Sequence, residues 1–402
     1  MLGDLGSPHL GFRSVLVGGT NGKGSVAAMT EALLRAHGPR TGLYTSPHLV
    51  DPSERIRIDG EPIGPELFER CARRVLPLAE IAGATFFESL TAVAFLAFAE
   101  AGVDAAAVEV GLGGRLDATN VLQPDCCVIT NVSMDHADWL GDSVEAIAAE
   151  KAGIIKPSVP LVGGRLSGPA GAVVGARAAS VGAPHVRLGI EFGAADVTTG
   201  RFGTRFTYWC EDRRSPDGSG FELPLPGVHQ ADNAALALTA VRMAGFPLRA
   251  EPSRMALRAV EWPGRFQLVE LGGTTLVLDV AHNPAGANSL ALALDQISLP
   301  SPRVGLIGIL GDKPWGEMLG PLLRRLDHAV FTVPPSAPAE RAWDPAAARA
   351  TFPTDEVEVV NRFPDALDRA LELAGSGTVL VTGSNHTVGD ALRQIEAIKS
   401  RG

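Results

Sequence analysis

The 402-residue sequence lacks any long run of apolar residues. A membrane-spanning helix needs roughly 20 consecutive, mostly apolar residues, and no stretch of the chain reaches that length. Residues 1–8 also lack the basic start and apolar centre of a signal peptide. We therefore expect a cytoplasmic protein that does not insert into a membrane.

A surplus of positive charge is missing as well. The 35 Lys and Arg residues face 45 Asp and Glu residues, which gives a net charge of −10. This balance argues against broad electrostatic binding to nucleic acid, although a local basic pocket can still bind a small anionic substrate. The four cysteines have no C-x-x-C spacing, so we expect free, buried thiols in a reducing compartment.

Lysine is rare among the basic residues. Only Lys23, Lys151, Lys156, Lys313 and Lys399 are lysine, while the other basic residues are arginine. A chain that uses arginine almost everywhere should keep lysine where an ammonium group or an amine is chemically required. Lys23 and Lys151 are therefore candidate functional residues, with codon bias as the alternative explanation.

Helical and strand-like segments alternate along the chain. Short apolar strands are predicted at 41–45, 105–110 and 126–132, and helices at 26–36, 65–82 and 87–101, with a polar loop that contains residues 54–58. Strands separated by helices imply a parallel sheet with right-handed crossovers, so the loops at their carboxyl ends gather at one edge.

The composition changes after residue 166. A β-ribbon is expected over 201–226, broken by Ser-Pro-Asp-Gly-Ser-Gly at 215–220, and an alanine-rich helix ends near residue 244. The Pro-Gly break at 263–264 then restarts the alternation, with strands near 275–280, 303–309, 328–333, 357–360 and 378–381. We predict two α/β domains, 1–262 and 263–402.

The glycine-rich stretch at residues 15–26 has the form of a phosphate-binding loop. A short apolar strand is followed by a turn with one lysine and by a helix start, an arrangement that wraps backbone N–H groups around a polyphosphate. The usual pattern G-x-x-x-x-G-K-[ST] is met only in part, because Gly24 separates Lys23 from the hydroxyl of Ser25.

The same stretch contains Gly22-x-Gly24-x-x-Ala27, a dinucleotide pattern, so a nicotinamide oxidoreductase is the competing interpretation. Its ribose would need an acidic residue at the end of the second strand, where the sequence has Tyr44-Thr45-Ser46. A regulatory GTPase would need an N-K-x-D motif, which the sequence lacks. A glycine turn without a ligand is the remaining alternative.

Polar residues follow the predicted strands at the same edge. Glu109 ends an apolar strand, where a carboxylate could hold Mg²⁺ beside a phosphate loop, and Asp135 and His136 follow the next strand. In the second domain, Asp279 and His282 follow the first clear strand. They indicate either a cleft or an Asx turn with a helix start at Pro284.

Nine motifs occur in order from about residue 5 to the C-terminus. They are GTNGKGS (19–25), TSPHL (45–49), ERIRIDGEPI (54–63), EVGLGGRLDATN (109–120), DHADWLG (135–141), EKAGIIK (150–156), HQADNAA (229–235), PGR (263–265) and DVAHNPAG (279–286). This string resembles the folylpolyglutamate synthase and dihydrofolate synthase family, within the wider Mur ligase group. The resemblance implies a P-loop ATPase-like domain followed by a Rossmann-like ligase domain.

The resemblance also implies the chemistry. ATP would phosphorylate a carboxylate of dihydropteroate or of a reduced folate, and the amine of L-glutamate would attack the acyl phosphate to form an amide. These small molecules are the expected partners, and we expect a monomer. A Mur-type ligase acting on a nucleotide-linked peptide is the alternative, against which TSPHL and the glycines after Glu109 argue.

Roles for individual residues follow from the resemblance alone. The phosphates would lie against Thr20, Asn21, Gly22, Lys23, Gly24 and Ser25, and Mg²⁺ against Ser46, Glu109 and His136. Lys151 matches a lysine that is carbamylated in relatives and helps to place a second Mg²⁺. Because CO₂ reacts with a neutral amine, burial should lower the pKa of Lys151.

The remaining roles concern the nucleotide cleft and the pterin. Asn233, Arg265, Asp279 and His282 match residues of the nucleotide cleft on the side of the second domain. Lys23, Lys151, Asp279 and His282 are the expected catalytic residues. Phe86 and Phe87 resemble an aromatic patch near the pterin site, with a core position at a helix start as the alternative.

Overall fold

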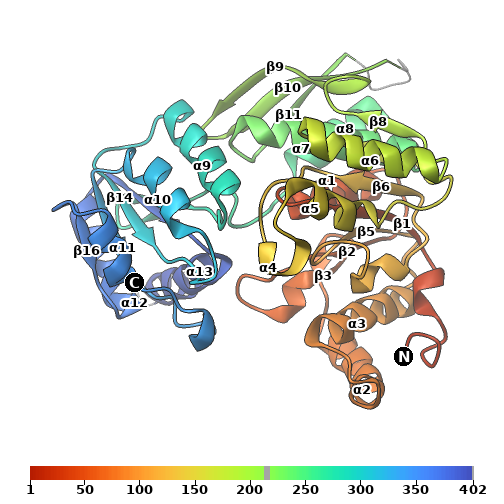
Figure 1. Cartoon of the computed structure of the whole chain (residues 1–402), viewed down its shortest axis with the longest axis horizontal. Coiled ribbons are helices and arrows are strands. Elements are labelled where there is room, and N and C mark those ends of the chain that lie inside the picture. Colours follow the sequence, from red (N-terminus) through yellow and green to blue (C-terminus); the bar gives the residue numbers. More distant parts are fainter. Residues whose placement is uncertain (212–217, 401–402) are drawn as a thin grey trace. The chain divides into compact units, whose positions relative to one another are not determined.

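The computed structural model describes residues 1–211 and 218–400, which divide into two compact units (Figure 1). The first unit consists of residues 1–197, 205–223 and 230–260. The second consists of residues 198–204, 224–229 and the chain from 261 onward. Two short segments that precede the predicted boundary at residue 262 are thus grouped with the second unit.

An eight-stranded sheet forms the centre of the first unit, in the order β4-β3-β2-β5-β1-β6-β7-β8. Its strands are β1 (Arg13–Gly18), β2 (Thr41–Tyr44), β3 (Ile56–Ile58), β4 (Glu61–Pro62), β5 (Ala105–Glu109), β6 (Cys126–Ile129), β7 (Leu161–Gly163) and β8 (His185–Arg187). All neighbours from β2 to β8 pair in parallel, whereas β3 and β4 are antiparallel additions at one edge.

The prediction of a loop at 54–58 is wrong for residues 56–58. Ile56 to Ile58 form β3, which pairs with β2 so that Ile56 lies opposite Tyr44. Ile56 is completely buried, and β-branched residues suit an extended strand. Because β3 forms only by pairing with β2, it cannot be predicted from the sequence of residues 56–58 alone.

The central strands are buried on both faces. In β1 the side chains of Val15, Leu16 and Val17 are fully covered, and every residue of β5 is buried as well. Continuous apolar strands of this kind are typical of parallel sheets covered by helices on both sides. The register places Val17 beside Glu109 of β5, and Gly18 beside Ile129 of β6, which confirms the predicted parallel sheet.

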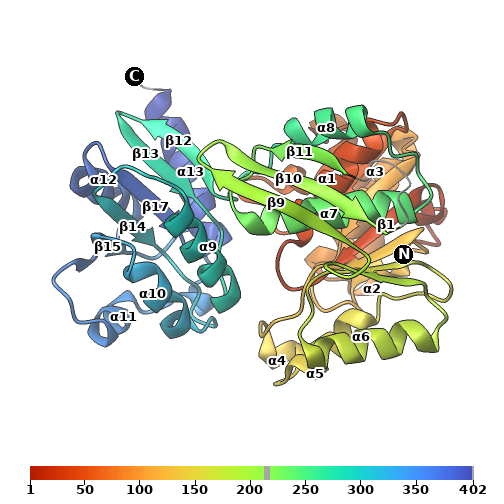
Figure 2. The same ribbon diagram turned by 90° about the horizontal axis from the view of Figure 1, so that it is seen from above.

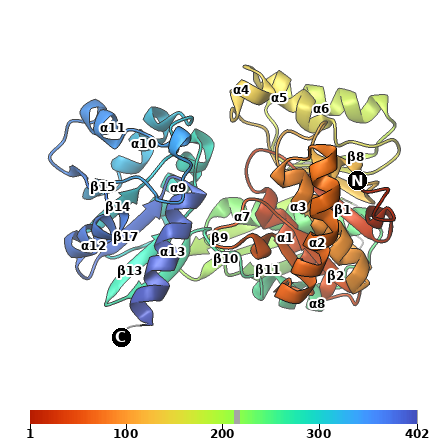
Figure 3. The same ribbon diagram turned by 90° about the horizontal axis from the view of Figure 1, so that it is seen from below.

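Eight α-helices begin in the described residues of this part of the chain, and four of them form two packed pairs. The eight are α1 (Lys23–Arg35), α2 (Pro65–Ala82), α3 (Phe86–Ala101), α4 (Ala137–Leu140), α5 (Val144–Ala152), α6 (Gly168–Ser180), α7 (Val228–Met243) and α8 (Ala250–Arg258). α2 packs along α3, and α5 packs along α6 (Figure 3). α3 begins with a capping box between Thr85 and Glu88 and ends at Gly102, whose φ of 67° suits glycine.

A separate three-stranded sheet contains β9 (Phe192–Gly200), β10 (Gly203–Cys210) and β11 (Ser219–Leu223), as Figure 2 shows. β10 and β11 lie within the β-ribbon expected over 201–226, whereas the whole of β9 precedes that range. Residues 215–217 of the predicted break lie outside the described residues, and the break is wrong at Ser219 and Gly220, which begin β11.

The second unit has its own six-stranded sheet in the order β12-β13-β17-β14-β15-β16. Its strands are β12 (Gln267–Leu271), β13 (Thr274–Leu278), β14 (Arg303–Ile307), β15 (His328–Phe331), β16 (Val357–Val359) and β17 (Thr378–Thr382). Its helices are α9 (Pro284–Gln296), α10 (Trp315–Leu323), α11 (Pro345–Thr351), α12 (Phe363–Ala374) and α13 (Asn385–Lys399). All five predicted strands are present, and only β12 runs antiparallel to its neighbour.

The composition predicts buried thiols and no membrane-spanning helix. All four cysteines are buried thiols that form no disulfide within residues 1–211 and 218–400, as predicted. Within residues 1–211 and 218–400, every helix is too short or too polar to cross a membrane.

Gly164, directly after β7, offers a test of the tight packing at this sheet. Its N–H donates to the carbonyl of Ile129 at 2.8 Å, and a Cβ added there would lie 1.8 Å from the carbonyl oxygen of Thr130. Backbone cannot move aside as a flexible side chain can. We expect Gly164→Ala to lower the free energy of unfolding by about 3 kcal/mol in urea denaturation.

Gly175 in α6 is the matched control, because nothing lies within 4 Å of a Cβ added there. Gly175→Ala should stabilise the protein by about 0.5–1 kcal/mol through helix propensity alone. Equal stability of Gly164→Ala and the parent protein would contradict the packing argument.

Candidate active site

The glycine loop is attached to the end of β6 by hydrogen bonds. The N–H of Thr20 donates to the carbonyl of Asn131, and the N–H of Asn21 donates to the Asn131 side chain, both at 2.9 Å. The Thr130 hydroxyl donates to the carbonyl of Asn21 at 2.6 Å. Gly19 has a φ of 139°, and a Cβ there would lie 1.9 Å from that hydroxyl oxygen. The loop is therefore held in one conformation.

Sequence reasoning did not assign Thr130 and Asn131 to the site. The available signal was that two polar residues directly follow the buried strand β6, at the sheet edge where the glycine loop was expected. Strand ends of this kind are where parallel sheets bind ligands.

Helix α1 begins at Lys23, directly after Gly22 with its φ of 80°. The positive end of its backbone dipole, with its first N–H groups, therefore faces the loop. Asn233 of α7 explains why position 22 is glycine, because a Cβ on Gly22 would lie 2.7 Å from the Asn233 Oδ1. The Asn233 side chain also donates to Gln230 at 3.0 Å. We expected Asn233 on the side of the second domain, but it belongs to the first unit.

Two lysines converge on the same loop. Lys151 is 4% exposed and its side-chain nitrogen donates to the carbonyl of Gly19 at 2.9 Å, while that of Lys23 donates to the carbonyl of Thr20 at 3.1 Å. Burial, with a further contribution from the charge of Lys23, lowers the pKa of Lys151 to about 7. The predicted direction is confirmed, so a large fraction of Lys151 is a neutral amine near neutral pH.

Of the expected metal ligands, Ser46 and Glu109 lie together. The backbone N–H of Ser46 donates to Oε2 of Glu109 at 2.9 Å, and Glu109 is 4% exposed. His136 follows β6 in a left-handed conformation (φ 53°), with its Nε2 3.8 Å from Oδ1 of Asp135. Nowhere in residues 1–211 and 218–400 do three or more His, Cys, Asp or Glu side chains form a ready metal cage.

The glycine-rich loop after Glu109 is a close-packed structural segment. Asp117 accepts from the N–H groups of Leu112 and Thr119, at 2.9 and 3.0 Å, which folds the loop back on itself, and burial raises the pKa of Asp117. A Cβ on Gly111 would lie 2.5 Å from the ring of Phe87. Phe87 thus packs under the loop, whereas its neighbour Phe86 is 63% exposed.

In the second unit, the turn after β13 holds the other predicted residues. Asp279 accepts from two backbone N–H groups at 2.9 Å, and burial raises its pKa although the charge of Arg265 acts in the opposite direction. The ring of His282 donates through Nδ1 to the carbonyl of Val280 at 2.9 Å, since a carbonyl can only accept. Asn283 caps α9 with Pro284 in its first turn, so the predicted helix start is confirmed.

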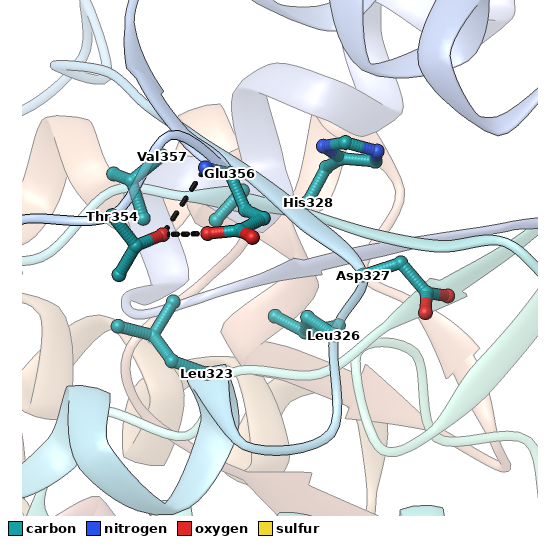
Figure 4. A pocket seen from close by; sticks show the side chains of 8 residues that line it. Leu323, Leu326, Asp327, His328, Thr354, Glu356 and Val357 are labelled. Atoms are coloured by element: carbon teal, nitrogen blue, oxygen red, sulfur yellow. Dashed lines mark hydrogen bonds between the residues drawn. The ribbon is translucent and has the colours of Figure 1, made fainter.

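A cavity of about 380 Å³ opens elsewhere in the second unit (Figure 4). It lies at the amino ends of β15 and β16, and its lining includes Leu323, Asp327, His328, Thr354 and Glu356. Asp279 follows the carboxyl end of β13. This strand runs in the same direction as β15, because β13 pairs in parallel with β17, β17 with β14, and β14 with β15. The cavity therefore opens at the opposite edge of the sheet from the predicted residues, and it is not part of the candidate site.

Known proteins match this chain along most of its length. Residues 17–241 match the model of the Mur ligase middle domain, and residues 264–385 match that of the Mur ligase glutamate ligase domain. The folylpolyglutamate synthase of Lacticaseibacillus casei is 36% identical over 405 residues, covering 98% of this chain and 92% of the relative. The dihydrofolate synthase/folylpolyglutamate synthase of Mycobacterium tuberculosis is 37% identical, covering 96% and 87%.

The chain belongs to the folylpolyglutamate synthase and dihydrofolate synthase family of Mur ligases. A solved structure of the Mycobacterium tuberculosis folylpolyglutamate synthase complexed with ADP superposes with a TM-score of 0.89 at 37% identity, covering 98% of this chain and 92% of that one. Membership of this family confirms the predicted fold class and the predicted class of enzyme, an ATP-dependent ligase. It also decides against the nicotinamide oxidoreductase, because the glycine loop lies within the Mur ligase middle domain.

The lowered pKa of Lys151 predicts how stability depends on pH. Between about pH 7 and 10.5 the unfolded chain binds a proton at this amine that the folded chain does not, so stability rises with pH by up to about 1.4 kcal/mol per unit. Below about pH 7 both states are protonated, and the cost of burying the charge is constant. The variant Lys151→Met lacks this titration.

Urea denaturation of both proteins in CO₂-free buffers between about pH 6 and pH 9 measures the effect. The free energy of unfolding of the parent protein minus that of Lys151→Met should stay flat up to about pH 7 and rise above it. A difference that stays constant up to pH 9 would show that the folded amine titrates normally.

Proposed function

We propose that this protein is an ATP-dependent ligase that joins L-glutamate to the carboxylate of dihydropteroate or of a reduced folate. The observation that carries the proposal is the glycine loop, which two lysine amines contact and which lies at the N-terminus of α1. A site of this kind is suited to a polyphosphate rather than to an uncharged ligand. The names of the relatives from Lacticaseibacillus casei and Mycobacterium tuberculosis support glutamate and folate as the substrates.

The reaction would proceed in two steps. A carboxylate oxygen of the acceptor bonds to the γ-phosphorus of ATP, while the bond from that phosphorus to the bridging oxygen breaks and ADP leaves with the electron pair. The glutamate amine then attacks the acyl carbon and expels phosphate, losing a proton as the amide forms. Most of the catalytic effect in the first step would come from positioning and from stabilising charge on the phosphoryl oxygens.

Residues 20–25 would hold the phosphates of ATP. The N–H groups at the start of α1 and the ammonium of Lys23 would donate to phosphoryl oxygens. The hydroxyl of Ser25 is buried without a hydrogen-bond partner among the described residues, so it has an unused donor and acceptor at the start of the helix. The ADP complex of the Mycobacterium tuberculosis relative supports an adenine nucleotide as a ligand of this protein.

The residues near Glu109 fit a magnesium ion. Mg²⁺ in nucleotide sites is usually held by one or two protein oxygens, with phosphates and water completing its shell, so a cage of three acidic side chains is not required. The Glu109 carboxylate and the Ser46 hydroxyl supply oxygen ligands of this hard type, and the backbone N–H of Ser46 donates to that carboxylate. Mg²⁺ would neutralise phosphate charge, and His136 stays a predicted third ligand.

Lys151 would be carbamylated and would hold a second Mg²⁺ through the new carboxylate. The reaction joins the neutral amine to CO₂ with release of one proton, and a pKa of about 7 makes that amine available. The roles of Asn233, Arg265, Asp279 and His282 at the nucleotide or the amino acid stay predictions. We also propose a monomer that acts in the cytoplasm, where a reducing environment would suit four buried cysteine thiols.

An assay with dihydropteroate and tetrahydrofolate in parallel tests the proposed function. Phosphate release should require ATP, glutamate and one of the two acceptors together, and mass spectrometry should find a product enlarged by one glutamyl residue. Lys23→Ala should reduce the rate by at least about 100-fold, because a phosphate-binding cation is lost. Turnover with a muramyl peptide instead of either acceptor would assign the protein to the peptide ligases.

Lys151→Ala tests the carbamate separately. We expect the variant to lose activity and to recover part of it when short carboxylic acids such as acetate are added, because the acid supplies the missing carboxylate. Arg73→Ala, on the exposed surface of α2, is the control and should neither lose activity nor respond to acetate. Full activity of Lys151→Ala without any acid would eliminate the carbamate from the mechanism.

A further inference from the structure

Arg55 is a buried cation with almost no partner. The residue is 9% exposed, yet the only hydrogen bond of its side chain within residues 1–211 and 218–400 runs from Nε to Nδ1 of His48 at 2.9 Å. A guanidinium has five N–H donors, and burying a charge without pairing it is costly. Among these described residues, no carboxylate oxygen lies within 4.0 Å of a guanidinium nitrogen of Arg55, the distance that defines an ion pair.

Two nearby carboxylates interact with the charge of Arg55, but each has other hydrogen bonds. Glu54 accepts from the backbone N–H groups at positions 49, 50 and 51, at 2.9, 2.9 and 2.7 Å, and so holds the loop after β2. Glu109 accepts from the N–H of Ser46. Both lie close enough to favour the charged form of Arg55, although burial lowers its pKa.

The backbone fixes where Arg55 lies. It ends the short helix η2 (Pro52–Arg55), and its carbonyl accepts from the N–H of Thr45 at 2.9 Å, just beyond the carboxyl end of β2. Ser46 follows Thr45, so Arg55 is tied to the segment that carries Ser46, one of the proposed magnesium ligands. One face of the guanidinium lies over the ring of Phe86, 5.5 Å from its centroid, which leaves its edge for an anion.

We propose that Arg55 binds the carboxylate of the acceptor substrate, the group that ATP phosphorylates, and that it discriminates against acceptors without this negative charge. This assignment rests on the proposed function. The unused N–H groups of the guanidinium donate to the carboxylate oxygens as a charge-assisted pair. Phe86, which is exposed and in contact with Arg55, lies where the aromatic part of such a substrate would pack. Arg55 thus serves as a binding and positioning residue.

The His48 contact orients the guanidinium. Arg55 can only donate, so Nδ1 of His48 accepts, and the ring cannot carry a proton on that nitrogen. The hydrogen bond fixes one side of the fork and leaves Nη1 and Nη2 for the substrate. Arg55→Lys retains the charge without this geometry, so it should restore only part of the affinity.

The proposal is tested by comparing the binding of dihydropteroate with that of its carboxamide analogue. Both are titrated in the presence of a non-hydrolysable ATP analogue. Calorimetric titration of the full-length parent protein should show tighter binding of the carboxylate than of the carboxamide. Arg55→Ala should weaken binding of the carboxylate by about 30-fold or more and leave that of the carboxamide nearly unchanged. In turnover, the KM for the acceptor should rise while the KM for ATP stays constant.

Arg73→Ala is the matched control, because it removes an exposed arginine of the same unit and should change neither affinity. If Arg55→Ala does not fold, as judged by thermal unfolding, Arg55→Gln and Arg55→Lys carry the same comparison. A folded Arg55 variant that retains the parental preference for carboxylate over carboxamide overturns the assignment. A parent protein that binds neither ligand and makes no glutamyl product overturns the proposed function instead.

Discussion

Parallel pairing of β1 with β5 on one side and β6 on the other is the constraint on which the site depends. Because all three strands run in the same direction, the chain leaves each of them at the same edge. The glycine loop, Glu109 and Asn131 meet there although they are far apart in the sequence. The sheet thus determines which segments meet, and the side chains at the strand ends determine what the edge can bind.

Close packing around the loop explains why it contains so much glycine. Gly19 has no space for a Cβ beside Thr130, and Gly22 has none beside Asn233, so each glycine permits a polar side chain to approach the backbone. These side chains hold or flank the loop, and part of its hydrogen bonding is satisfied before a ligand arrives. Preorganisation of this kind lowers the entropic cost of binding a polyphosphate.

The sequence predicts well those features that depend on neighbours along the chain. Apolar strands followed by polar turns locate the sheet edge, and the rarity of lysine marks Lys151 as a candidate functional residue. Features that depend on distant partners are not predictable in this way. Ile56 becomes a strand residue only because β2 offers an edge, and Asn233 reaches Gly22 only because α7 folds back on the loop. Arg55 looks like half of an ion pair until the structure assigns Glu54 to the backbone.

Local charge in the first unit runs against the charge of the whole chain. The net charge is −10, yet Lys23, Lys151 and Arg55 all lie near the carboxyl edge of one sheet. The lysine amines donate to backbone carbonyls rather than to carboxylates, and their mutual repulsion contributes to the low pKa of Lys151. Clustered, incompletely neutralised cations destabilise the ligand-free fold, and anionic ligands remove that cost when they bind. The acidic surface therefore does not weaken binding at this edge, because potential is set by the nearest and least screened charges.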